Sequence, residues 1–113
     1  MRLASFVLNG SESFGVVTNK GVHLVQANFK DHTPNLKSVF SKQKTMDLLS
    51  FCEENPLPLS EVSLLPPIPN PGKIICAGMN YRKPYPVDGV APPDPGNVVI
   101  FARHTETLVG HGA

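Results

Sequence analysis

The chain has 113 residues and a formal net charge of +1, from ten Lys and Arg against nine Asp and Glu. This length fits one ordinary domain and excludes two large ones. Hydrophobic residues make up 41% of the chain and charged residues 17%, so it has material for a core and should fold. The basic residues form no block, so we expect no nucleic-acid partner.

We expect no targeting signal in the N-terminal region. No apolar run approaches the roughly 20 residues of a membrane helix, and the first ten residues lack the long apolar stretch and cleavage site of a signal peptide. We therefore expect a cytoplasmic protein with no membrane partner. Cys52 and Cys76 stand alone, which indicates buried thiols rather than a disulfide framework or a zinc site.

The first 25 residues predict a three-stranded antiparallel meander. Residues 2–8 are rich in strand formers and end at the turn dipeptide Asn9-Gly10. Residues 14–18 read as the second strand, and residues 22–25 return after a second turn. His23 alternates with its apolar neighbours, which places it on the opposite, solvated face and favours a structural role over a ligand role.

Between residues 31 and 55 the apolar spacing becomes helical. Thr33 as a cap and Pro34 at the first helical position predict a short helix. Its apolar face consists of Leu36, Val39 and Phe40. Thr45 predicts the cap of a second helix before the stop at Pro56. The stripe of that second helix consists of Leu48, Leu49 and Cys52.

Prolines divide the rest of the chain, because eleven of the twelve lie between Pro56 and Pro95. Residues 57–71 alternate prolines with apolar residues and predict an extended linker between two units. The apolar runs at 73–78 and 97–102 predict buried strands. The proline-rich loop between them is long enough to be functional or mobile.

The residue types alone form no complete catalytic constellation. The nine acidic residues never occur two apart, so no strand presents two carboxylates on one face to a hard cation. The sequence contains no G-x-S-x-G elbow and no glycine-rich phosphate loop. From physics alone, Gly78-Met79-Asn80-Tyr81 ends a buried strand, where small residues and polar tips often border a pocket.

Several segments resemble one known family. Residues 67–82 read P-I-P-N-P-G-K-I-I-C-A-G-M-N-Y-R, which resembles the domain junction of the fumarylacetoacetate hydrolase family, where a P-P-x-x-x-P-x-K-I segment enters a strand ending in G-x-N-Y. Residues 99–103 and 107–113 are similar to that family's next strand and its V-G-H-G turn. Residues 2–6 and 14–17 resemble its small N-terminal domain.

The resemblance implies a predominantly β, α+β fold. Residues 1–70 would form a small N-terminal domain of antiparallel strands and short helices, and residues 71–113 the beginning of a mixed β-roll catalytic domain. Family members are homodimers that bind Mg²⁺, Mn²⁺ or Ca²⁺ and hydrolyse, isomerise or decarboxylate 2-oxo or 1,3-dicarbonyl acids. The metal stabilises an enolate and a His beside a Glu activates water.

Four residues match substrate-binding positions of that family: Asn80, Tyr81, Arg103 and His111. Tyr81 would hydrogen-bond a substrate oxygen or pack on its own loop. Arg103 would hold a carboxylate in two hydrogen bonds or form a surface salt bridge. His111 would touch ligand or serve only as a turn residue between glycines.

Two departures from the family pattern limit which family roles can be assigned to residues of this chain. The position of the usual catalytic His is Pro84, which has no proton to transfer, and the family's metal ligands, a Glu-x-Glu pair and a later Asp, lie beyond the V-G-H-G turn. We therefore expect a fragment of a longer enzyme that is inactive and binds no metal by itself. The alternative is a freestanding, non-catalytic module that binds a partner through a sheet edge or its apolar strands.

Overall fold

A computed structural model describes residues 1–78, 89–90 and 96–113. These residues divide into two compact units, one made of Met1–Pro71 with Leu108–Ala113 and one made of Gly72–Thr107. Within the described ranges, no helix has the length and apolar character needed to cross a bilayer. The predicted domains, 1–70 and 71–113, remain a prediction about the protein's organisation.

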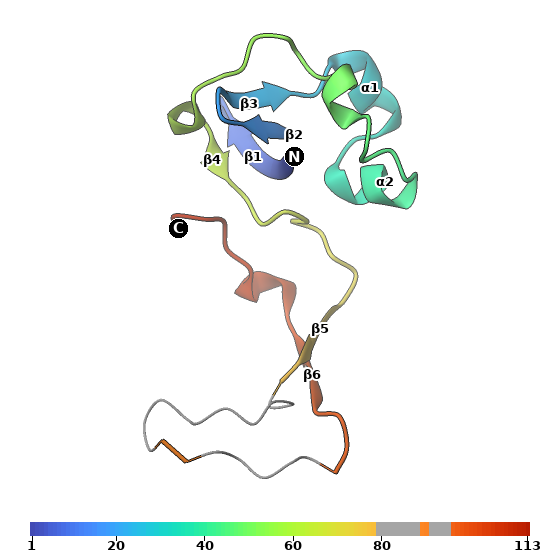
Figure 1. The fold of residues 1–113 in the computed structure, drawn as a ribbon, viewed down its shortest axis with the longest axis vertical. Helices are drawn as coiled ribbons and strands as arrows, with labels where there is room; N and C mark the ends of the chain where they lie inside the picture. The colour runs from blue at the N-terminus through green and yellow to red at the C-terminus, as the bar shows by residue number, and fades with distance from the viewer. Residues whose placement is uncertain (79–88, 91–95) are drawn as a thin grey trace. The chain divides into compact units, whose positions relative to one another are not determined.

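The first unit contains a four-stranded antiparallel sheet with the order β3-β2-β1-β4 (Figure 1). Strand β1 spans Arg2–Leu8, β2 spans Ser11–Thr18, β3 spans Gly21–Leu24 and β4 spans Ser63–Leu64. Asn9 and Gly10 link the first two strands with positive φ angles of 50° and 78°, the geometry of a tight hairpin turn. The predicted meander is confirmed.

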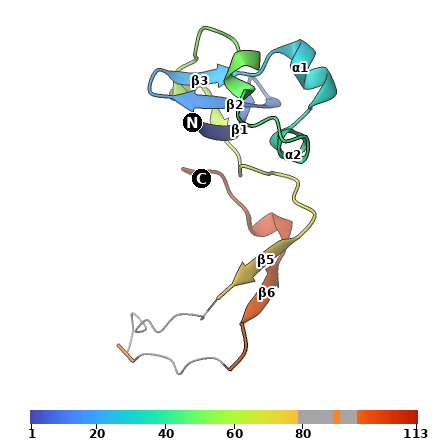
Figure 2. The same cartoon turned by 45° about the vertical axis from the view of Figure 1, so that its right-hand side comes forward.

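Two short helices lie together beside this sheet in both ribbon views (Figures 1 and 2). Helix α1, Ala27–His32, was not predicted, and α2 spans Leu36–Ser41. The cap of α2 is Asn35 rather than Thr33, because the Ser38 N–H donates to Asn35 Oδ1 (3.0 Å) and the Asn35 N–H donates to Ser38 Oγ (3.2 Å). The prediction of Thr33 as the cap is wrong.

The second predicted helix is wrong as well. Only a 3₁₀ turn, η1, forms at Leu48–Phe51, and Leu49 is 46% exposed rather than part of an apolar stripe. The last residue of the turn and the backbone just after it bond to the chain at and beyond the end of β3, since the Gln26 N–H donates to the Phe51 oxygen and the Glu53 N–H to the Leu24 oxygen. These tertiary bonds compete with a longer helix.

One hydrophobic core joins the sheet to the helices. Leu36, Val39 and Leu48 are fully buried there, while Phe40, predicted on the same face, is 50% exposed. The core consists of Phe14, Val16, Val25, Phe29, Leu36, Val39, Leu48 and Cys52. This single core makes the first unit a packed structure in its own right.

The segment predicted as a linker is instead packed on the first unit. It contains a 3₁₀ turn, η2, at Leu59–Glu61 and strand β4, which pairs with β1. The Leu65 N–H donates to the Ser5 oxygen (2.9 Å), and Ile68 packs against the core. Prolines exclude this segment from helices and from most sheet ladders, but they leave its carbonyls and side chains available for contacts.

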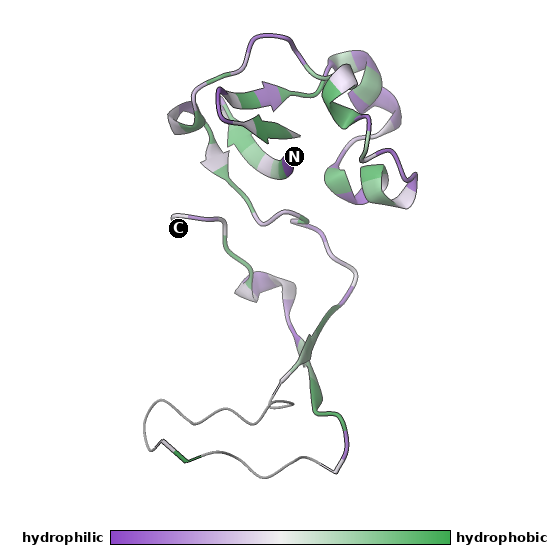
Figure 3. Cartoon of the chain, viewed as in Figure 1, coloured by the Kyte–Doolittle hydropathy of each residue, from purple (hydrophilic) through white to green (hydrophobic). Residues whose placement is uncertain are grey.

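In the second unit, β5 (Ile74–Ala77) and β6 (Ile100–Arg103) form a two-stranded antiparallel ribbon, followed by a 3₁₀ turn, η3, at Thr105–Thr107. The strands are apolar (Figure 3), yet Ile75 is 68% and Ile100 65% exposed. The expectation that these strands are buried is wrong, because no second layer among the described residues covers the two-stranded ribbon. The predicted fold class, predominantly β with short helices, is confirmed.

Candidate functional site

The G-x-N-Y candidates cannot be placed. Asn80 and Tyr81, predicted to bind substrate, and Pro84, at the usual position of the catalytic His, lie outside the described residues. Their roles therefore stay predictions. The described part of this motif ends at Gly78, directly after β5.

Arg103 is the last residue of β6 and is exposed. Its guanidinium carbon lies 5.7 Å from the centre of the Phe101 ring, a cation–π contact between residues on the same face of the strand. At an exposed site such a contact contributes about 0.5–1 kcal/mol. The ring therefore biases the guanidinium toward one orientation while leaving its N–H groups available for an anion.

Gly78 fixes the surroundings of Phe101 from the opposite strand. A Cβ at Gly78 would lie 2.8 Å from Phe101 Cε1, and the Gly78 N–H donates to the Val99 oxygen (3.1 Å). The ring thus lies closely against the glycine backbone, where any other residue would force it to move. In this way the end of the ribbon brings the glycine of G-x-N-Y next to the residue that contacts Arg103.

His111 belongs to the first unit, whereas Arg103 belongs to the second. His111 is exposed and lines a cleft of about 500 Å³ with residues that include Leu59, Val62 and Leu64. The preceding Gly110 must be a glycine, because a Cβ there would overlap the Leu64 carbonyl oxygen. The V-G-H-G turn is thereby held against β4, and contact of His111 with a ligand remains a prediction.

Both ring nitrogens of His23 lie within hydrogen-bond distance of other residues of the first unit, which agrees with a structural role. Its Nε2 lies 3.2 Å from Thr18 Oγ1 and its Nδ1 lies 3.0 Å from the Glu53 carbonyl oxygen. A carbonyl oxygen only accepts, so the bond to Glu53 requires a proton on Nδ1. The side chain is half-buried rather than fully solvated, and it connects β3 to the segment after η1.

Cys52 behaves as a core residue, as predicted. It is 5% exposed and its Sγ lies 3.3 Å from the Leu48 oxygen. Burial raises the pKa of the Cys52 thiol, and the nearby Glu53 carboxylate adds to the rise, so the reactive thiolate is disfavoured. Cys76 is only half-buried, so the prediction of a buried thiol is wrong for this residue. Among the described residues, no group of three His, Cys, Asp or Glu side chains is placed to hold a metal ion.

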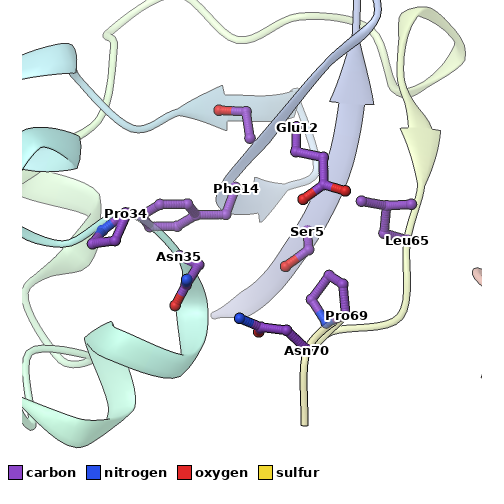
Figure 4. Close-up of a pocket in the computed structure, with 9 residues that line it drawn as sticks. Ser5, Glu12, Phe14, Pro34, Asn35, Leu65, Pro69 and Asn70 are labelled. Atoms are coloured by element: carbon purple, nitrogen blue, oxygen red, sulfur yellow. The ribbon is translucent and has the colours of Figure 1, made fainter. Parts of the chain in front are cut away.

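A cavity of about 180 Å³ in the first unit was not predicted (Figure 4). Its lining combines β1, β2, the start of α2 and the segment after β4, with Ser5, Glu12, Phe14, Asn35, Pro69 and Asn70 among its residues. No sequence motif joins these positions, because they come from four separate segments. Only the tertiary structure brings them together.

The chain is similar in sequence to oxaloacetate tautomerases. It is 31% identical over 102 residues to the mitochondrial oxaloacetate tautomerase FAHD2A of Homo sapiens, a match that covers 85% of this chain and 32% of the relative. It is 44% identical over 55 residues to the oxaloacetate tautomerase YisK of Bacillus subtilis, covering 48% of this chain and 18% of that protein. The chain therefore spans about a third or less of the relatives that it matches.

These similarities support the resemblance to the fumarylacetoacetate hydrolase family. The bovine relative named oxaloacetate tautomerase FAHD2A, mitochondrial, adds a match of 39% identity over 54 residues, which covers 48% of this chain and 17% of the relative. No family model matches the chain, and no solved structure matches it.

Proposed function

We propose that this chain belongs to a fumarylacetoacetate hydrolase-family enzyme that isomerises a 2-oxo acid of the oxaloacetate type. The observation that carries the proposal is the 31% identity over 102 residues, 85% of this chain, to a human oxaloacetate tautomerase. Isomerisation is preferred over the family's hydrolysis and decarboxylation because the human, bovine and Bacillus subtilis relatives are named tautomerases.

In this proposal Arg103 holds a substrate carboxylate. A guanidinium forms two parallel hydrogen bonds with a carboxylate, and the contact with Phe101 orients it at the end of β6. Tautomerisation moves a proton from the carbon next to the carbonyl to the carbonyl oxygen, so a held carboxylate fixes the carbon that loses the proton. Asn80, Tyr81 and His111 remain the other proposed substrate contacts.

The divalent ion implied by the family resemblance does not fit the described residues, which offer no donor group of three. We therefore assign no step of the reaction to it here. Our proposal is that an Mg²⁺, Mn²⁺ or Ca²⁺ ion of the parent enzyme is bound by other residues. Homodimerisation and a cytoplasmic location are proposals too, to be tested by light scattering and by cell fractionation.

The test uses the natural protein that carries this sequence, purified from its source cells. Its intact mass is measured first, and the loss of oxaloacetate enol absorbance is then followed with Mg²⁺ and with EDTA. We expect Mg²⁺-dependent turnover, and a decrease in kcat/KM of about tenfold to a hundredfold for Arg103→Lys, which keeps the charge but loses the two-bond geometry. Arg2→Lys, an exposed control on β1, should retain full activity.

The 113-residue chain alone is expected to be inactive, and robust Mg²⁺-dependent turnover by it would contradict this part of the proposal. The rival function, a non-catalytic binding module, draws support from the first unit's own core. It predicts no turnover by the natural protein and no thermal shift with Mg²⁺ plus oxalate, whereas a competent enzyme is stabilised by such ligands.

A further inference from the structure

The turn between β1 and β2 carries a chemically reactive pair of residues, Asn9 and Gly10. The main-chain nitrogen that follows an asparagine can attack the carbonyl carbon of the asparagine side chain and close a five-membered ring. A glycine hinders this attack least, because it has no Cβ and the widest range of main-chain conformations. Asn9 is the one asparagine of the chain that a glycine follows. The sequence therefore favours the reaction at this turn over every other asparagine.

The structure leaves both residues of the turn free. Asn9 and Gly10 are exposed, and neither forms a hydrogen bond with any described residue. A Cβ built at Gly10 would meet no atom within 4 Å, so the space around the attacking nitrogen is open. The main-chain rotation that brings this nitrogen to the Asn9 side chain therefore breaks no hydrogen bond of either residue.

The other asparagines in the loops of the first unit lack one of these conditions. Asn55 and Asn70 each precede a proline, whose nitrogen carries no hydrogen to lose. Asn19 lies in an exposed turn as well. However, the next main-chain N–H, that of Lys20, donates to Thr18 Oγ1 (3.2 Å). The attacking nitrogen at Asn19 is thus already held, unlike the one at Asn9.

The asparagines at the two helices are held by hydrogen bonds of their side chains. Asn28 Oδ1 accepts the N–H of Phe29 (2.8 Å), which is the group that would have to attack. Asn35 Oδ1 accepts the Ser38 N–H (3.0 Å) and caps α2, so ring closure there would remove the cap. Sequence and structure together single out Asn9.

We propose that Asn9 is a site of spontaneous deamidation, and that part of the product is isoaspartate. The Gly10 nitrogen gives its proton to solvent and forms a bond to Asn9 Cγ. The Cγ–Nδ2 bond breaks, and the side-chain nitrogen takes a proton from solvent and leaves as ammonia. Water then opens the ring at one of its two carbonyls. Cleavage of the new bond leaves aspartate, and cleavage of the original main-chain bond leaves isoaspartate.

Isoaspartate would change the hairpin as well as its charge. It adds one carbon atom to the main chain within the two-residue turn that joins Leu8 to its partner Ser11. The length of such a turn fixes the register of the two strands. The isoaspartyl chain therefore cannot keep both the tight turn and the pairing of Leu8 with Ser11. The aspartyl product keeps the main chain and adds only a negative charge.

The experiment follows the purified 113-residue chain during incubation in neutral buffer. Protease digestion and mass spectrometry locate each amide that is lost, and enzymatic methylation of isoaspartyl carboxyl groups with a labelled methyl donor measures isoaspartate. A synthetic peptide of residues 5–14 gives the rate without the fold. We expect Asn9 to react at least tenfold faster than Asn19, and no more than about tenfold slower than in the peptide.

Matched variants separate the contribution of each position. Asn9→Gln, whose longer side chain disfavours ring closure, should reduce methylation at least tenfold, whereas Asn19→Gln in the other exposed turn should leave it unchanged. Lys20→Gly places a glycine after both asparagines and keeps the N–H that bonds to Thr18, so Asn9 should still react faster than Asn19. Circular dichroism checks that each variant is folded.

Three outcomes would overturn the proposal. The first is an intact Asn9 in the folded chain after the peptide has reacted completely. The second is equal methylation of Asn9→Gln and the wild-type chain. The third is equal reaction of both asparagines in Lys20→Gly, which would show that the free N–H of Gly10 does not select the site. None of these outcomes bears on catalysis, so the proposal stands or falls separately from the tautomerase function.

Discussion

The bond between the Ser5 hydroxyl and the Pro67 oxygen provides a direct test of how the proline-rich segment packs. Ser5 is 3% exposed and donates over 2.8 Å. In Ser5→Ala the Pro67 oxygen loses this donor. A net hydrogen bond contributes about 0.5–1.5 kcal/mol. Because Pro67 is exposed, water can replace the lost donor, so we expect the free energy of unfolding to decrease by about 0.5–1.5 kcal/mol.

Urea unfolding followed by circular dichroism measures this change. Each 1 kcal/mol corresponds to a decrease in Tm of about 4–8 °C for a unit of 60–100 residues. The Leu65 N–H donates to the main-chain oxygen of Ser5, and hydrogen exchange at this amide should accelerate in the variant. Ser11→Ala, at an exposed site on β2, is the matched control, with an expected change within about 0.5 kcal/mol. Equal stability of the two variants would refute the packed arrangement.

Two further predictions concern the η1 region. Leu48→Ala should lower the free energy of unfolding by about 2–5 kcal/mol, because Leu48 is fully buried. Leu49→Ala, at a position that is 46% exposed, should lower it far less. Similar urea midpoints for the two variants would contradict the assignment of Leu48 to the core. A thiol reagent should label the half-buried Cys76 before the buried Cys52. Because burial raises the pKa of the Cys52 thiol, this thiol ionises at a lower pH in the unfolded chain than in the folded one. The free energy of unfolding should therefore fall as the pH rises above the usual thiol pKa. Faster labelling of Cys52, or a flat alkaline stability profile, would count against this.

Site features made of residues that are close in the sequence could be predicted, whereas features that join distant segments could not. The V-G-H-G and G-x-N-Y motifs are contiguous in the chain, so a sequence pattern records them without knowledge of the fold. The contact of Arg103 with Phe101 follows from alternation along one strand. By contrast, the cavity beside Glu12 depends on where four segments meet, which no single motif records.

The meander could be predicted from the sequence alone, because strand formers, the Asn9-Gly10 turn and period-two alternation act between near neighbours. The predominance of β structure could be predicted in the same way. Local signals failed at Thr33, where Asn35 offered a better reciprocal cap, and in the predicted linker, where Ser5 supplied a donor from 62 residues away. These features depend on the folded arrangement of the chain, because their free energies come from hydrogen-bond partners that the local pattern does not reveal.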